Sequence, residues 1–393
     1  MEEQELQITH EGQVNSYMQN QLRNSVESIL ANQSPNGAIV ASPDFYNYHY
    51  CWLRDGSFIA YALDRAGEHQ AAQRFHQWVA GALEGISALI DDAVQCHARG
   101  QRIPATHMPP ARFALDGSVV EDDWPNFQID GYGAWLWALE QHLTESGAGP
   151  LPAHWHNTVQ RVARYLDELA LTDCYDVWEE NGNARHVSTL ACVYAGLMAA
   201  SRLLELPELA VRAQAVKLTA RQGTERLGRF VKSTSSDAVD ASLLWLATPF
   251  GLVEPDDPYF QATVDAIEHQ LSFDGGIRRY PEDVYYGSGA WPVLTASLGW
   301  HHARLGNYAE AQRCHRWISA RLDPQGRLAE QYGGELRDPQ HYGEWERRWG
   351  QPAADLTWSQ AMHVVLTKEL AAQADVLARQ AQGQWPTEEV PHA

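Results

Sequence analysis

Apolar residues recur at helical spacing in one segment after another along the chain. In the first such segment, Val14, Met18, Leu22, Val26 and Leu30 follow one another at intervals of four residues, on one face of a helix. Alternating patterns typical of half-buried strands are short and rare. Helix start and stop signals predict helices near residues 11–32, 55–66, 68–94, 130–147, 153–170, 187–203, 207–231, 237–247, 256–270, 289–305, 307–321 and 354–379. The pattern predicts an all-α fold of about twelve helices.

A pattern of seven residues occurs twice, 239 positions apart, and each copy spans a helix end, a glycine turn and the next helix. The two copies are Arg65, Gly67, Ala72, Gln73, Arg74, His76, Trp78 and Arg304, Gly306, Ala311, Gln312, Arg313, His315, Trp317. Repeated helical hairpins are typical of a barrel, so twelve helices in six hairpins favour an (α/α)6 barrel. No linker rich in Pro, Gly or Ser divides residues 1–393, and we expect them to form a single domain.

The longest predicted non-helical stretches are 99–129, 272–288 and 322–353, and loops of that length inside a compact domain are usually functional. Five segments in or beside loops combine carboxylates or Arg with Trp or Tyr: YNYHYCWLRDG (46–56), WPNFQIDGYG (124–133), YDVWEENG (175–182), GGIRRYPEDVYYGSGAW (275–291) and LAEQY (328–332). Carboxylates and guanidinium groups bind vicinal hydroxyls, and aromatic faces cover the apolar faces of sugar rings. The five segments together indicate a sugar-binding site.

Charge and composition exclude several other classes of function. The net charge of -21 repels nucleic acid and anionic lipid, so we expect a neutral or cationic small-molecule ligand. No run of eighteen apolar residues predicts a membrane span. The acidic and polar start, MEEQELQITHEG, does not resemble a secretory signal, which favours a cytoplasmic location. The sequence does not predict an oligomeric state.

We predict neither a metal site nor a cofactor. The five cysteines are scattered without CxxC spacing, which argues against a disulfide framework or a zinc site. Two histidine pairs, His154 with His156 and His301 with His302, lie on predicted helices at spacings that point the two side chains to different faces. Glycine-rich phosphate-binding motifs are absent.

Four motifs resemble glycoside hydrolase family 15, the glucoamylases and their relatives, over about residues 40 to 365. They are the WxRD of Trp52, Arg54 and Asp55, the DxWEE of residues 176–180, the RYPED of residues 279–283, and the late Glu330, followed by LTWS at 356–359. The resemblance implies a catalytic barrel with Glu179 as general acid and Glu330 as general base. It gives no sign of the N-terminal β-sandwich of bacterial relatives or of a starch-binding module.

The same resemblance implies roles for other residues. Tyr48 would help hold the attacking water, Arg54 and Asp55 would bind the terminal glucose, and Glu180 would line the neighbouring sugar site. The full predicted substrate-binding set is Tyr48, Trp52, Arg54, Asp55, Trp124, Gln128, Asp130, Trp178, Glu180, Arg279 and Trp291.

Glycosidic cleavage requires one protonated carboxyl and one ionised carboxylate, separated by roughly 6.5 to 9.5 Å when the configuration is inverted. We expect Trp178 and Glu180 to keep Glu179 protonated near neutrality, and we expect Glu330 to stay ionised. Inversion itself is implied by the resemblance. The predicted reaction is exo-hydrolysis of short α-1,4- or α-1,6-linked gluco-oligosaccharides with release of β-D-glucose.

Three alternatives stay open at this point. They are an α,α-trehalase of the same family, a non-catalytic sugar-sensing domain, and an epimerase of the N-acylglucosamine epimerase type that uses a pair of histidines. A further departure from the family is the long stretch after Glu330, which contains HYGEWERRWG (341–350). This segment either covers the leaving-group side of the site and favours short substrates, or is a solvated surface loop.

Overall fold

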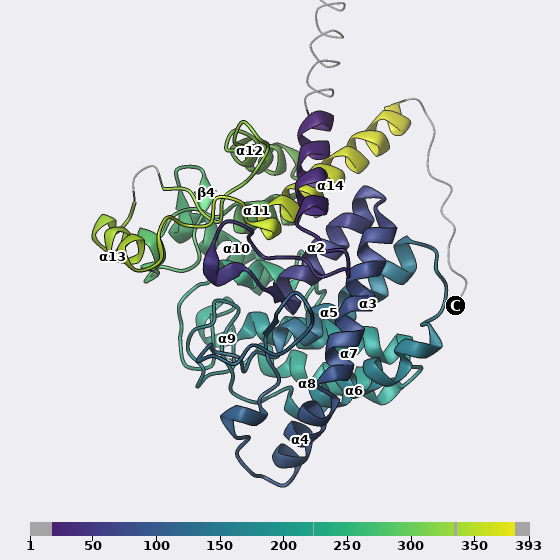
Figure 1. Ribbon diagram of the computed structural model, residues 1–393. Coiled ribbons are helices and arrows are strands. Elements are labelled where there is room, and N and C mark those ends of the chain that lie inside the picture. Colours follow the sequence, from purple (N-terminus) through teal and green to yellow (C-terminus); the bar gives the residue numbers. More distant parts are fainter. Residues whose placement is uncertain (1–17, 223, 334–335, 382–393) are drawn as a thin grey trace, which may run out of the picture.

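The computed structural model describes residues 18–381 except 223 and 334–335, and its regular secondary structure is almost entirely helical (Figure 1). After a first helix at 18–31, the α-helices are α2 Leu53–Ala66, α3 His69–Gly85, α4 Ser87–Ala98, α5 Asp130–Glu145, α6 His156–Leu169, α7 Val187–Leu203, α8 Pro207–Ala220, α9 Thr224–Leu227, α10 Pro258–Leu271, α11 Pro292–Arg304, α12 Tyr308–Ser319, α13 Pro339–Trp349 and α14 Thr357–Ala381. The 3-10 helices are η1 Tyr46–Tyr48, η2 Ala105–His107, η3 Ala153–Trp155, η4 Ala241–Leu246 and η5 Tyr285–Gly287.

Four two-residue strands form two antiparallel pairs. They are β1 Cys51–Trp52 with β2 Arg112–Phe113, and β3 Ser272–Phe273 with β4 Gly276–Ile277.

Six helical elements form a closed inner ring, in the order α2, α5, α7, η4, α11 and α14, with α14 returning to contact α2. Nearly every residue of α2, α5, α7 and α11 is buried, whereas α3, α8 and α12 each bury one face against α2, α7 and α11. An inner helix buried all round and an outer amphipathic helix are the two layers of an (α/α)6 barrel. The predicted fold class is confirmed.

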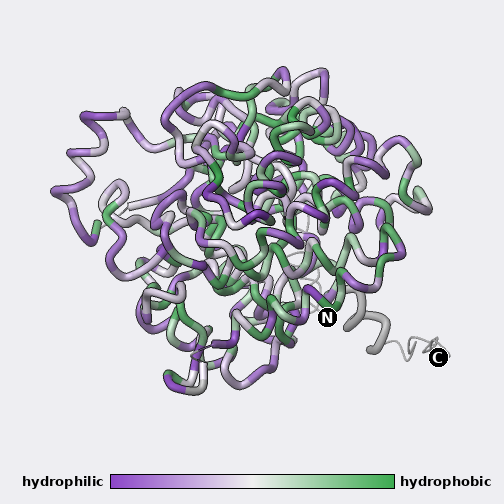
Figure 2. Tube along the Cα trace, turned by 90° about the horizontal axis from the view of Figure 1, so that it is seen from below, coloured by the Kyte–Doolittle hydropathy of each residue, from purple (hydrophilic) through white to green (hydrophobic). Residues whose placement is uncertain are grey.

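Hydrophobic segments are concentrated in the interior, and the outer loops are mostly hydrophilic (Figure 2). Large aromatic side chains fill the centre of the ring: Phe58 packs against Trp137, Trp245, Phe250 and Trp358, each with ring centroids less than 6 Å apart. Within the part of the chain that the structure describes, no helix is both long enough and apolar enough to cross a membrane.

Most predicted helices are observed within a few residues of their expected ends, but four expectations need correction. The segment 68–94 is two helices, because the chain turns at Ile86 while the apolar periodicity continues through the turn. The segment 207–231 is helical to Ala220 and again only in the short α9. The segment 237–247 is a six-residue 3-10 helix capped by Asp240. The loop 322–353 contains α13. The first part of the helix predicted at 11–32, residues 11–17, lies outside the described residues.

The internal repeat has a structural counterpart. His76 on α3 packs against His142 on α5 with ring centroids 5.0 Å apart, and its counterpart His315 on α12 packs against His363 on α14 at 5.2 Å. In each copy, the repeated tryptophan donates its indole N–H to a loop carbonyl. The two copies therefore pack in the same way in different parts of the barrel.

Ring closure requires a close approach between α5 and α7. A Cβ atom on Gly133 would lie 2.3 Å from the carbonyl oxygen of Cys192, and one on Gly196 would lie 2.6 Å from the Cα of Gly133. No real Cβ atom tolerates such distances from backbone, so the two glycines set the spacing of these two inner helices.

We predict that Gly133→Ala destabilises the protein by roughly 1–3 kcal/mol or more, because the added methyl group must push α5 away from α7. Thermal denaturation followed by circular dichroism measures the effect. The matched control is Gly81→Ala on α3, where an added Cβ meets nothing within 4 Å and should be neutral or slightly stabilising. Equal melting temperatures for the two variants would contradict this account of the ring.

Candidate active site

A cavity of about 380 Å³ lies at the end of the ring where the inner helices begin. This volume is near the small end of the roughly 300–1,000 Å³ typical of small-molecule sites. The segments lining it precede or begin α2, α5, α7, α11 and α14. Its walls are Ala41, Phe45, Asn47, Tyr48, Trp52, Arg54, Asp55, Trp124, Pro125, Val177, Trp178, Glu179, Glu180, Arg279, Tyr285, Trp291, Glu330, Trp345, Arg348, Trp349, Leu356 and Trp358. The five sequence segments thus meet at one place.

Asp176 shapes the turn that carries Glu179 and Glu180. Its carboxylate accepts the backbone N–H groups of Trp178 at 3.0 Å and Glu180 at 2.8 Å, and its carbonyl oxygen accepts the N–H of Glu179 at 2.9 Å. This turn holds Glu179 in the left-handed region, with φ of +67°, which is a costly conformation for a residue other than glycine. The hydrogen bonds to Asp176 are what hold this conformation in place.

Glu179 accepts two hydrogen bonds on the same oxygen. The indole N–H of Trp52 reaches Oε1 at 2.5 Å, and the amide of Gln128 reaches it at 3.2 Å. Its sequence neighbours are engaged elsewhere: the Trp178 indole donates to Asp240 at 3.0 Å, and Tyr280 donates its hydroxyl to Glu180. The environment of Glu179 is therefore set by residues distant in sequence.

Glu330 lies on the cavity wall with only 1% of its surface exposed. Its Oε1 accepts the hydroxyl of Tyr48 at 2.8 Å, and the hydroxyl of Tyr285 lies 2.8 Å from that of Tyr48. Because Tyr48 has one proton and donates it to Glu330, Tyr285 must be the donor to Tyr48. Within the described part of the chain, Oε2 of Glu330 has no hydrogen-bond partner.

Burial raises the pKa of the Glu330 carboxyl to about 7, although the hydrogen bond from Tyr48 and the charge of Arg279 act in the opposite direction. The sequence led us to expect that Glu330 stays ionised near neutrality, and burial shifts its protonation equilibrium towards the neutral form. The sequence shows the residues adjacent to Glu330, but not that the folded chain removes it from water. Desolvation disfavours the charged form and is the largest effect here.

Arg54 and Asp55 form the floor of the cavity at the start of α2. The guanidinium of Arg54 pairs with Asp55 at 3.2 Å and with the buried Asp130 at 3.0 Å, and it donates to Gln128 at 3.1 Å. Burial raises the pKa of Asp55 to about 6, although the charge of Arg54 opposes the shift. Gln128 and Asp130 of the predicted substrate-binding set are buried and are not among the lining residues; Asp130 accepts a hydrogen bond from Arg54, and Gln128 donates one to Glu179.

The opposite wall is organised around Arg279. This buried guanidinium pairs with Asp283 and lies 3.5 Å from a carboxylate oxygen of Glu180. Its central carbon lies 5.3 Å from the ring centroid of Trp178 and 5.6 Å from that of Trp291. This wall therefore combines charged groups with aromatic rings, as the composition of the sequence segments indicated.

Trp52 and Trp124 pack edge to face with ring centroids 5.8 Å apart. The short sheet pairs Trp52 with Arg112, whose guanidinium carbon lies 3.8 Å from the ring centroid of Trp124. The loop 99–129 thus fixes the orientation of the Trp52 indole that donates to Glu179.

Several lining residues were missing from the predicted set. Tyr285 lies in the segment 275–291 and Trp358 in LTWS, so the motifs contained both, but the sequence offered no reason to choose them over neighbouring aromatics. Trp345, Arg348 and Trp349 belong to α13, and their presence on the wall shows that HYGEWERRWG lies at the cavity. Of the two interpretations of that segment, the one that places it over the site is supported.

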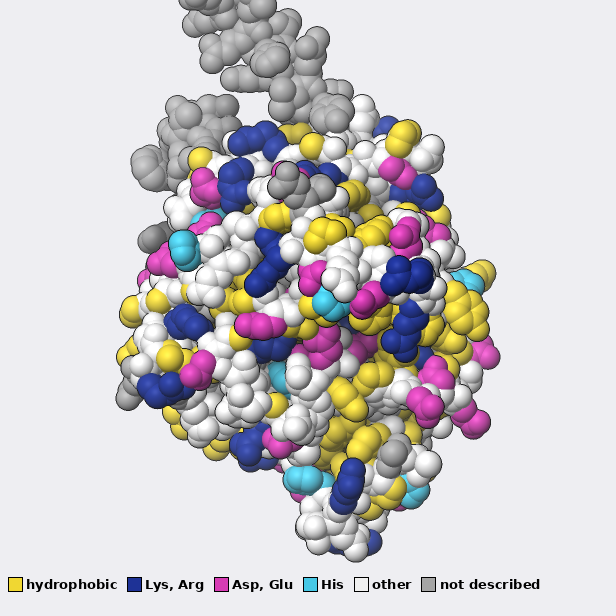
Figure 3. Space-filling view, turned by 90° about the vertical axis from the view of Figure 1, so that its left-hand side faces the viewer, with side chains coloured by type: hydrophobic (Ala, Val, Ile, Leu, Met, Phe, Trp, Pro, Cys, Tyr) yellow, Lys and Arg dark blue, Asp and Glu magenta, His cyan; other side chains and the backbone are white. Residues whose placement is uncertain are grey.

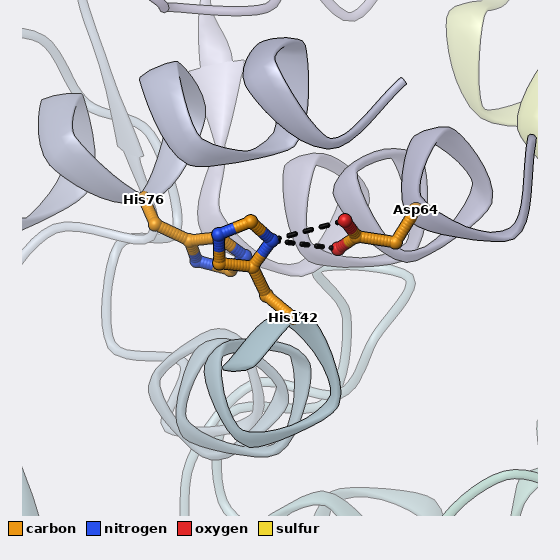
Figure 4. Close-up of side chains that lie close together, drawn as sticks. All are labelled: Asp64, His76 and His142. Carbon is orange, nitrogen blue, oxygen red and sulfur yellow. Dashed lines mark hydrogen bonds and ion pairs between the residues drawn. The ribbon is translucent and has the colours of Figure 1, made fainter. Parts of the chain in front are cut away.

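Outside this cavity, Asp64, His76 and His142 are buried together, with potential ligand atoms within 4.8 Å of one another (Figure 4). Asp64 lies nine residues after Asp55 on α2, so the cluster is about 13 Å farther along the helix. Nδ1 of His142 lies 3.0 Å from both oxygens of Asp64, and Nδ1 of His69 lies 2.8 Å from one of them. These hydrogen bonds satisfy Asp64 without an ion, and the absence of a metal site stays a prediction.

Comparison with known proteins gives consistent matches. The family model described as glycosyl hydrolases family 15 matches residues 15–385. The isomaltose glucohydrolase of Kribbella flavida is 40% identical over 358 residues, which cover 88% of this chain and 92% of that protein. Trehalase 2 of Sulfolobus acidocaldarius is 24% identical, over 72% of this chain and 53% of its own length. A solved structure described as a wild-type glycosidase superposes with a TM-score of 0.85 at 38% identity, covering 91% of this chain and 97% of that one.

Proposed function

Because the chain belongs to glycosyl hydrolases family 15, we propose that it is an exo-acting, inverting hydrolase that releases β-D-glucose from short α-1,4- or α-1,6-linked gluco-oligosaccharides. One observation carries the proposal: Glu179 and Glu330 lie on the wall of the same cavity, and each is held by a different set of hydrogen bonds. Two carboxyl groups with different environments can act as acid and base in one reaction.

Glu179 is the proposed general acid. Both of its donors, Trp52 and Gln128, reach Oε1, as suits the carbonyl oxygen of a protonated carboxyl group. The proton then resides on Oε2, from which it passes to the oxygen of the breaking glycosidic bond. The leaving sugar departs as a neutral alcohol, and positive charge develops at the anomeric carbon of the terminal glucose.

Glu330 is the proposed general base. Its Oε1 is occupied by Tyr48, so Oε2 accepts the proton of a water molecule as the oxygen of that water attacks the anomeric carbon. The Tyr285–Tyr48 chain supports the ionised form of Glu330, which burial disfavours. Attack from the face opposite the leaving oxygen yields β-glucose from an α-linked substrate.

The substrate class follows from the size of the cavity and from the relatives. A small pocket with Arg54 and Asp55 at its floor suits one terminal glucose and the sugar attached to it. The similarity to an isomaltose glucohydrolase favours the α-1,6 linkage, and the more distant trehalase makes α,α-trehalose the second candidate. Membership of a hydrolase family disfavours the epimerase, and two intact carboxylates disfavour the sensing domain.

The decisive experiment is proton NMR of fresh digests of maltose, isomaltose and trehalose, following the anomeric proton of released glucose before mutarotation. The glucose from the non-reducing end should be released as the β-anomer, while the reducing-end glucose leaves with the anomeric ratio of the substrate; we therefore expect an initial excess of β-glucose over that ratio, formed fastest from isomaltose. An initial excess of α-glucose over the same ratio would contradict inversion. Equal amounts of α- and β-glucose from trehalose, with no cleavage of the other sugars, would identify a trehalase.

We predict that Glu179→Gln lowers kcat on isomaltose about 10²- to 10⁴-fold, because the leaving oxygen loses its proton donor. The same variant should retain far more activity on α-D-glucosyl fluoride, because fluoride departs as an anion without protonation. Glu330→Gln should lose both activities, since both reactions need an activated water. The control is Glu282→Gln, an exposed carboxylate of the RYPED motif. Identical losses on both substrates for Glu179→Gln would contradict its role.

We predict that kcat/KM loses a factor of ten per pH unit below about pH 7, because only ionised Glu330 can accept a proton and burial places its pKa there. Tyr285→Phe removes a hydrogen bond that favours the ionised form, so this acid limb should move to higher pH. Tyr46→Phe is the control, because Tyr46 is exposed beside the cavity. A limb unchanged by Tyr285→Phe would show that the tyrosine chain does not act on the base.

A further inference from the structure

Helix α13 presents one polar-aromatic face to the cavity. Trp345, Arg348 and Trp349 all line the wall, and their spacing of i, i+3 and i+4 places them on the same side of the helix. No residue of α13 is fully buried, and Trp349 is 42% exposed. Two tryptophans that face a cavity without being buried by protein offer apolar surface to a ligand.

The helix is fixed at both ends to η5. At its start, the N–H of Asp338 donates to the carbonyl of Gly287 at 3.2 Å, and at its end the hydroxyl of Tyr286 donates to the carbonyl of Gly350 at 2.9 Å. Between these points, the Trp345 ring packs edge to face on Tyr285 with centroids 4.9 Å apart. The position of α13 is therefore tied to the tyrosine pair beside Glu330.

Exposure increases from the floor of the cavity towards α13. Arg54, Asp55 and Glu330 are buried, Trp345 is half-buried, and Arg348 and Trp349 are exposed. In a pocket that cleaves chain ends, the terminal glucose occupies the floor and the leaving sugar lies nearer the mouth. The exposed face of α13 is thus placed where the leaving sugar must be.

The chemistry of this face suits a neutral hexose. The guanidinium carbon of Arg348 lies 4.9 Å from the ring centroid of Trp349, and a guanidinium group carries five N–H donors in one plane. Such donors bind hydroxyls while the indole covers the apolar face of a pyranose. The side of the molecule on which α13 lies shows acidic, basic and hydrophobic side chains interspersed, which also suits an uncharged ligand (Figures 1 and 3).

We propose that α13 forms the binding site of the leaving sugar, a glucose unit that Trp345 and Trp349 cover and Arg348 binds through its hydroxyls. The inference rests on the proposed function and specifies the part of the substrate that α13 recognises. A helix at the mouth also leaves less room for a third sugar, so the same residues favour disaccharides over longer chains.

The test compares substrates with and without a leaving sugar. Arg348→Ala and Trp349→Ala should lower kcat/KM for isomaltose roughly 10- to 100-fold more than kcat/KM for α-D-glucosyl fluoride, whose leaving group touches nothing on α13. Trp349→Ala should also raise the ratio of isomaltotriose to isomaltose hydrolysis. The matched control is Arg347→Ala, an exposed arginine of the same helix that does not line the cavity; its substrate ratios should stay within about twofold of wild type.

Outcomes that overturn the inference differ from those that overturn the proposed function. Equal losses on isomaltose and glucosyl fluoride, or equal effects of Arg347→Ala and Arg348→Ala, would show that α13 does not recognise the leaving sugar. A wild-type protein that hydrolyses neither the fluoride nor any disaccharide would instead refute the proposed function. Trp349→Phe keeps an aromatic face, so its isomaltose activity should lie nearer to wild type than that of Trp349→Ala.

Discussion

Closure of the inner ring of helices is the constraint on which the rest of this structure depends. The ring closes because α5 and α7 approach at Gly133 and Gly196, and because large aromatic side chains fill the centre. With the inner helices running in the same direction, the segments that lead into them meet at one end. Residues from positions 41 to 358 of the chain thereby share one cavity of about 380 Å³.

This convergence gives the two carboxyl groups different environments. Glu179 lies on a strained turn held by Asp176, and it receives donors from two other loops. Glu330 is buried, which raises its pKa. The hydrogen bonds from Tyr285 to Tyr48 and from Tyr48 to Glu330 act in the opposite direction. A fold that held both groups in water would give them similar proton affinities and would not separate acid from base.

Helix α13 forms a further part of the cavity wall. It is attached through η5, the same short segment that carries Tyr285, so the mouth of the cavity and the side of the site that holds Glu330 share one support. Recognition of the leaving sugar and positioning of the base would then depend on one piece of the structure.

The sequence by itself determined the helical layers, because a periodicity of 3.6 residues reports which face of each helix is buried. It also located the segments of the site, because motifs such as WxRD and DxWEE place charged and aromatic residues within a few positions of one another. Even so, the apolar periodicity continued through the turn at Ile86, so two helices were predicted as one. Helix α13 buries none of its residues and consists mostly of polar residues, so it was predicted as part of a loop.

Only the tertiary structure decided which side chains face the cavity. Gln128 and Asp130 belong to a segment predicted to bind sugar, yet they do not line the cavity, whereas Tyr285 and Trp349 do. It also decided the proton affinity of Glu330, which depends on how much water is excluded around the carboxyl group. Burial and hydrogen bonding between loops are set by atoms far apart in the chain, and no local pattern of residues records them.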